Sequence, residues 1–165
     1  MQIITAGRTG PNRSVRFGGD PDLDPRGRRD VLALSASLTR PIDICGPEAA
    51  TRATAEILGA TGGLIVDDAL RTLDVGAWSG LSPEEIDPVD LGGWFTDPEA
   101  RPHGGESVAQ FVDRVHAWRA GQAEHGDGYV VVAMPVAQAL LCVDADGFFA
   151  REVRPAALYT CTDAR

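Results

Sequence analysis

The segment Ile3-Ile4-Thr5-Ala6-Gly7-Arg8-Thr9-Gly10-Pro11-Asn12 decides the fold. The short apolar run over residues 2–5 is typical of a buried β-strand. It ends in a glycine-rich stretch, where the backbone can turn without a steric penalty. The segment therefore predicts a strand that leads into a loop.

Strand and helix patterns alternate through the rest of the chain. We expect strands at residues 42–45, 64–66, 129–133 and 157–161, the last of which could lie at an edge, and helices at 26–38, 47–58, 107–122 and 136–143. This alternation predicts an α/β fold, a three-layer α/β/α sandwich with a mainly parallel sheet. Ligands of such sheets bind beyond the carboxyl ends of the strands.

The stretch 73–102 breaks the alternation. It is rich in Gly, Pro, Asp and Trp and has no long hydrophobic period. We expect short helices that pass over the carboxyl edge of the sheet and form a wall of a binding site.

Length and composition limit the classes of protein. The 165 residues suffice for one domain, expected at 1–165. The net charge is −9, and all 15 basic residues are Arg, which argues against nucleic acid as a partner. No apolar run has the length of a membrane span and no secretory signal is visible, so we expect a cytoplasmic protein. Cys45, Cys142 and Cys161 lack metal-ligand spacing, so we expect buried thiols, no metal and no cofactor.

Five further segments follow in order, at residues 19–29, 46–58, 70–81, 104–107 and 130–135. Residues 70–81 are similar to L-R-E-L-D-F-G-x-W-E-G-L, and residues 104–107 match G-G-E-S. Residues 3–12 resemble an apolar strand followed by R-H-G-x-T-x-x-N, with Gly7, Thr9 and Asn12 in place. Over most of its length the chain thus resembles the histidine phosphatase (phosphoglycerate mutase-like) superfamily.

The resemblance implies a histidine phosphatase-like fold with an altered phosphate pocket. In that family an Arg and a His of the first motif, an Arg of the second and a His of the last surround the phosphoryl group, and the Glu of G-G-E-S donates a proton. The matching positions here hold Thr5, Ala6, Ala50, Met134 and Glu106. Phosphoryl transfer depends on positive charge against the phosphoryl oxygens, so we expect a degenerate member without ordinary phosphatase activity.

Glu106 and His103 are the candidate catalytic residues. If Glu106 faces Ala6, Ala50 and Met134, burial would make it a general acid or base near neutral pH. The alternative, that Glu106 only caps the helix at 107–122, stays open. His103 could be a second proton-transfer group at the mouth of the pocket, although a solvated loop histidine is the favoured interpretation.

The expected pocket lining comes from the loop after the first strand and from the residues that replace the family's set. Trp78 matches a core position of the family, whereas we expect Trp94 to be more open. Arg8 lies near a vacated position and could turn toward it. The complete set of expected lining residues is Thr5, Ala6, Arg8, Thr9, Asn12, Ala50, Trp78, Trp94 and Met134.

Three functions follow, in this order of preference. The first is a non-phosphatase whose vacated pocket binds a neutral or weakly polar small molecule and isomerises, cyclises or dehydrates it through Glu106. The second is an inactive pseudoenzyme that binds or regulates a protein partner, and the third is a residual phosphatase that uses a substitute such as His103. Whether the protein is an enzyme and whether it forms a homodimer stay open.

Overall fold

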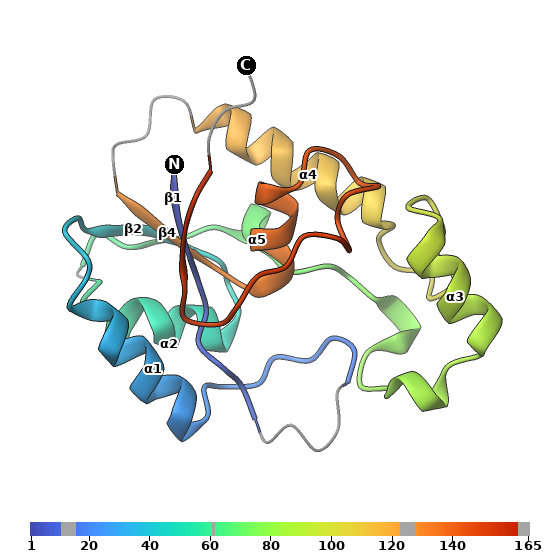
Figure 1. Cartoon of the computed structure of the whole chain (residues 1–165), viewed down its shortest axis with the longest axis horizontal. Coiled ribbons are helices and arrows are strands. Elements are labelled where there is room, and N and C mark those ends of the chain that lie inside the picture. Colours follow the sequence, from blue (N-terminus) through green and yellow to red (C-terminus); the bar gives the residue numbers. More distant parts are fainter. Residues whose placement is uncertain (11–15, 61, 123–127, 162–165) are drawn as a thin grey trace.

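The computed structural model describes residues 1–10, 16–60, 62–122 and 128–161, and a five-stranded sheet lies at its centre (Figure 1). The strands are β1 (Gln2–Thr5), β2 (Ile42–Cys45), β3 (Ile65–Val66), β4 (Tyr129–Val132) and β5 (Leu158–Thr160). Their order across the sheet is β3-β2-β4-β1-β5. The first four strands are parallel, and β5 pairs antiparallel with β1. The predicted α/β fold with a mainly parallel sheet is confirmed.

Helices cover both faces of the sheet (Figure 1). Successive strand residues point to opposite faces, so Ile3 and Ile4 belong to different cores. Ile3 packs with residues of α4 (Val108–Gly121) and α5 (Met134–Leu141). Ile4 packs with Ala55 of α2 (Ala49–Ile57) and with Leu34 of α1 (Pro25–Ser35).

The helix boundaries differ from the sequence prediction by one to three residues, and two of these differences have a clear local cause. α1 ends at Ser35 and not at residue 38, because both the amide and the hydroxyl of Ser37 donate to the carbonyl of Leu34 and close the last turn. α5 begins at Met134 and not at residue 136. Pro135 fits this start because a first-turn residue needs no amide hydrogen.

Residues 67–105 leave the sheet as an extended excursion. The structure gives it 3-10 turns at Asp68–Leu70, Gly76–Trp78 and Pro83–Glu85, followed by α3 (Pro88–Thr96). No helix in the described part of the chain is long and apolar enough to cross a membrane.

The three cysteines are buried, and none forms a disulfide in the described part of the chain. Burial raises the pKa of the Cys45 and Cys142 thiols, so both are held in the neutral form.

Candidate active site

The loops that follow β1, β2 and β4 meet at the carboxyl edge of the parallel strands. Ala6 and Ala50 lie here in one small apolar cluster with Leu23. Met134, the first residue of α5, follows β4 at this edge, and its side chain is 40% exposed. The structure therefore brings Ala6 and Ala50 together, as the family motifs imply.

Side-chain and backbone hydrogen bonds fix the loop after β1. The amide of Gly7 donates to Thr54 Oγ1 over 3.0 Å, and that hydroxyl donates to the carbonyl of Ala50 over 2.7 Å. On the other side, α1 approaches so closely that a Cβ at Gly27 would lie 2.2 Å from the carbonyl oxygen of Arg8. The loop is thus clamped between α1 and α2.

The side chain of Arg8 forms an ion pair at the start of α1. Its Nε lies 2.9 Å from Asp24 Oδ2, and Asp24 Oδ1 accepts from the amide of Gly27 as the N-cap of that helix. Thr9 forms an isolated antiparallel bridge with Leu23, and Asn12 lies outside the described residues. The structure therefore gives Arg8 a carboxylate partner instead of the vacated phosphate position.

Thr5 turns toward the C-terminal part of the chain. Its fully buried hydroxyl donates to the carbonyl of Arg154 over 2.6 Å and accepts from the amide of Ala157 over 3.0 Å. A hydroxyl of the first strand is thereby inserted into the turn that precedes β5. Thr5 holds that turn and does not present a free polar group to a pocket.

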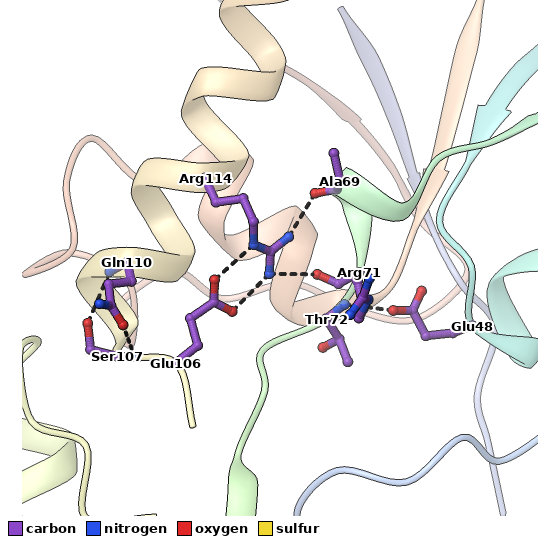
Figure 2. Close-up of polar contacts among 8 residues, drawn as sticks. All are labelled: Glu48, Ala69, Arg71, Thr72, Glu106, Ser107, Gln110 and Arg114. Atoms are coloured by element: carbon purple, nitrogen blue, oxygen red, sulfur yellow. Dashed lines mark hydrogen bonds and ion pairs between the residues drawn. The ribbon is translucent and has the colours of Figure 1, made fainter. Parts of the chain in front are cut away.

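Glu106 forms an ion pair with Arg114 of α4 (Figure 2). Its two carboxylate oxygens accept from Arg114 Nε and Nη2 over 2.8 and 2.9 Å. The same guanidinium donates to the carbonyls of Ala69 and Arg71, which follow β3. Arg114 therefore joins the Gly104–Ser107 motif to the exit of β3, and the sequence interpretation missed it because eight residues separate it from Glu106.

The pairing of Glu106 with a cation was not expected from the sequence. The N-cap of α4 is Ser107, whose hydroxyl accepts from the amide of Gln110 over 3.1 Å.

His103 is buried between aromatic rings, and the interpretation of it as a solvated loop residue is wrong. Its side chain is 3% exposed and packs against Trp78 at 5.0 Å and Trp94 at 6.2 Å between ring centroids. Trp94 is itself 5% exposed, so it is a core residue and not an open one. Burial lowers the pKa of His103, and the negative charge of Asp74 partly opposes that effect.

The imidazole orders the G-G-E-S segment from inside. His103 Nδ1 accepts from the amide of Gly105 over 3.0 Å, which leaves the proton of the neutral ring on Nε2. That nitrogen has no hydrogen-bond partner among the described residues. Gly76 approaches the same segment with a φ of 47°, and a Cβ there would lie 2.3 Å from the carbonyl oxygen of His103.

Metal ligands do not gather at this edge. Within the described ranges there is no group of three or more His, Cys, Asp or Glu side chains placed to hold a metal ion.

The fold and this arrangement of loops define the class of protein. The chain belongs to the histidine phosphatase superfamily (branch 1), whose family model matches residues 3–162. It is similar to glucosyl-3-phosphoglycerate phosphatase of Mycolicibacterium vanbaalenii, with 32% identity over 124 residues that make up 69% of this chain and 55% of that protein. It is also similar to phosphoserine phosphatase 1 of Hydrogenobacter thermophilus, with 33% identity over 105 residues, or 58% of this chain and 50% of that protein.

The chain spans about half the length of these two curated relatives. A solved mycobacterial glucosyl-3-phosphoglycerate phosphatase complexed with VO3 superimposes with a TM-score of 0.78 at 24% identity. The match covers 96% of this chain and 90% of that one, and it supports the shared fold.

The relatives contradict the expected function. We expected a non-phosphatase that binds a neutral molecule and uses Glu106 as acid or base, whereas the matched proteins are named phosphatases. That prediction is wrong, and the matches give no support to a pseudoenzyme or a repurposed enzyme.

Proposed function

We propose that this protein is a phosphatase that acts on small phosphomonoesters. The observation that carries the proposal is the family match over residues 3–162, together with phosphatase relatives at 32% and 33% identity. The names of these relatives specify phosphoserine and glucosyl-3-phosphoglycerate, which are both phosphomonoesters. Phosphomonoesters are therefore the first substrates to test with this protein.

The geometry of the sheet supports this choice. Four parallel strands end at one edge, and the loop after β1, the start of α2 and the start of α5 follow them there. Open α/β sheets bind their ligands at this edge. The hydrogen bonds of Gly7 and Thr54 hold the first of these loops in place before any ligand binds.

The proposed reaction does not pass through a phosphohistidine at the family position, because Ala6 stands there. Water is then the nucleophile. A bond forms between the water oxygen and phosphorus, the bond from phosphorus to the ester oxygen breaks, and the proton released by water goes to the departing alcohol. Because each missing stabilising donor typically lowers the rate by about 100-fold or more, we expect slow turnover.

Release of inorganic phosphate tests the proposal. Purified protein would be incubated with phosphoserine, glucosyl-3-phosphoglycerate and 4-nitrophenyl phosphate, with heat-unfolded protein from the same preparation as the control. We expect slow release from at least one ester and no labelled phosphoenzyme after rapid acid-free quenching. Release no faster than the control from every ester would refute the function, and a phosphohistidine would refute the water route.

A further inference from the structure

An open groove of about 660 Å³ lies beside α5 and β5, where the C-terminal segment returns to the sheet. Its lining includes two cations, Arg151 and Arg154, the amide of Gln138, and the rings of Phe149 and Tyr159. We call it the arginine groove. None of its side chains belongs to the family motifs in the sequence.

The two cations of the groove are available to a ligand. Both are exposed, and neither guanidinium has an ion pair or a hydrogen bond to any residue in the described part of the chain. By contrast, Arg8 and Arg114 each pair with a carboxylate. Glu152 also lines the groove, so its ionisable side chains carry a net charge of +1, the sum of two Arg and one Glu.

Hydrogen bonds attach the backbone of this groove to the loop after β1. The hydroxyl of Thr5 bridges the carbonyl of Arg154 and the amide of Ala157, and the amide of Ala156 donates to the carbonyl of Ala6 over 3.1 Å. Ala156 has a φ of 50°, a conformation that favours glycine, so these contacts hold a strained turn. Figure 1 shows the same proximity, with β5 running beside β1.

Thr5 therefore positions the turn that precedes β5. It occupies the place of the family's first arginine, and it fixes the turn that carries Arg154. Arg151 and Arg154, which have no ion pair or hydrogen bond from their guanidinium groups within the described part of the chain, therefore belong to a segment that Thr5 holds against β1.

We propose that the arginine groove binds the phosphate group of a phosphomonoester, with Arg151 and Arg154 as its donors. This inference rests on the proposed phosphatase function. Guanidinium groups bind phosphate through paired, charge-assisted hydrogen bonds. Phe149 and Tyr159 offer apolar surface to the organic part of the same molecule.

Titration with inorganic phosphate at low ionic strength, followed by calorimetry or by phosphorus NMR line width, tests the groove. The double variant Arg151→Gln/Arg154→Gln should weaken phosphate binding by about 10-fold or more, because it removes both donors. Glu152→Gln should tighten binding by a few-fold, since it removes a like charge from the anion. Arg29→Gln, an exposed cation on α1, is the matched control and should change nothing.

The outcomes separate this inference from the proposed function. Equal phosphate affinity in the double variant and the natural protein would overturn the groove, even if phosphomonoesters are hydrolysed. Loss of phosphate affinity confined to the double variant would support the groove, even if no ester is hydrolysed. Circular dichroism of each variant confirms that it is folded, which the exposure of both arginines leads us to expect.

Discussion

At the residue scale, two polar side chains of the expected site make contacts within the protein itself. Thr5 bridges a turn about 150 residues away in the chain, and Glu106 is bound by Arg114. The family motifs assigned Thr5, Ala6, Ala50 and Met134 to the site from their positions along the chain, and the structure places Ala6 and Ala50 in one cluster. It gave no signal for the Thr5 or Arg114 contacts, because no periodicity or motif links residues that meet only in the folded chain.

Replacing Thr5 by Val should destabilise the protein by about 1–3 kcal/mol, because the Arg154 carbonyl and the Ala157 amide lose a shared partner in two partly buried hydrogen bonds. Thr5→Ser keeps the hydroxyl and serves as the matched control. Urea unfolding followed by circular dichroism measures the difference. If the valine variant is as stable as the serine variant, the bridging hydrogen bonds contribute nothing to folding.

His103 should make the stability of the protein depend on pH. Burial lowers its folded-state pKa below the ordinary value of 6.5, so below that value the unfolded chain binds a proton that the folded protein resists. The contribution of His103 is complete above about pH 6.5 and is lost as the pH falls toward the folded-state pKa.

We therefore expect the free energy of unfolding to fall from pH 7 toward pH 5 more steeply in the natural protein than in His103→Asn. Asn retains an acceptor for the Gly105 amide but does not titrate. Denaturant unfolding across this pH range gives both slopes. Identical slopes would show that the buried imidazole is not the source of the effect.

At the element scale, hydrophobic pattern predicted the elements better than their pairing. The Val run of β4 and the apolar face of α4 gave clear predictions because each buries a continuous set of side chains. The antiparallel direction of β5 had no signal in its three residues, since it depends on the turn held by Thr5. Three of the four short helical elements of the excursion begin with Gly or Pro, at Gly76, Pro83 and Pro88.

The contact between α4 and the exit of β3 gives a prediction at this scale. Arg114→Met should destabilise the protein by about 2 kcal/mol, because Glu106 and two carbonyl groups lose a donor. In a double-mutant cycle with Glu106→Gln, we expect a coupling of about 1 kcal/mol, since both side chains are partly exposed and water screens the pair. Additive effects of the two substitutions would mean that the ion pair in Figure 2 contributes nothing.

At the scale of the whole molecule, the chain has the fold of the histidine phosphatase superfamily. The sheet order, the helix layers and the edge that carries the loops follow from the alternation of strands and helices. Function was harder to predict from the sequence. A comparison with the family motifs shows which charged side chains are missing, but it does not show which other side chains lie near those positions in the folded chain. Arg151 and Arg154 lie in a part of the sequence without a family motif, and both line one groove beside α5 and β5.

Introducing a negative charge at Met134 is the most direct test of whether phosphomonoester hydrolysis occurs at the carboxyl edge of the parallel strands. Met134 is 40% exposed at the start of α5, so it accepts a polar side chain without loss of the core. The measurement is the initial rate of phosphate release by Met134→Glu compared with Met134→Gln, which has the same size and no charge. We predict a rate at least about 10-fold lower for the glutamate variant, because its carboxylate repels the phosphate. Equal rates in the two variants, or no phosphate release by the natural protein, would contradict the account.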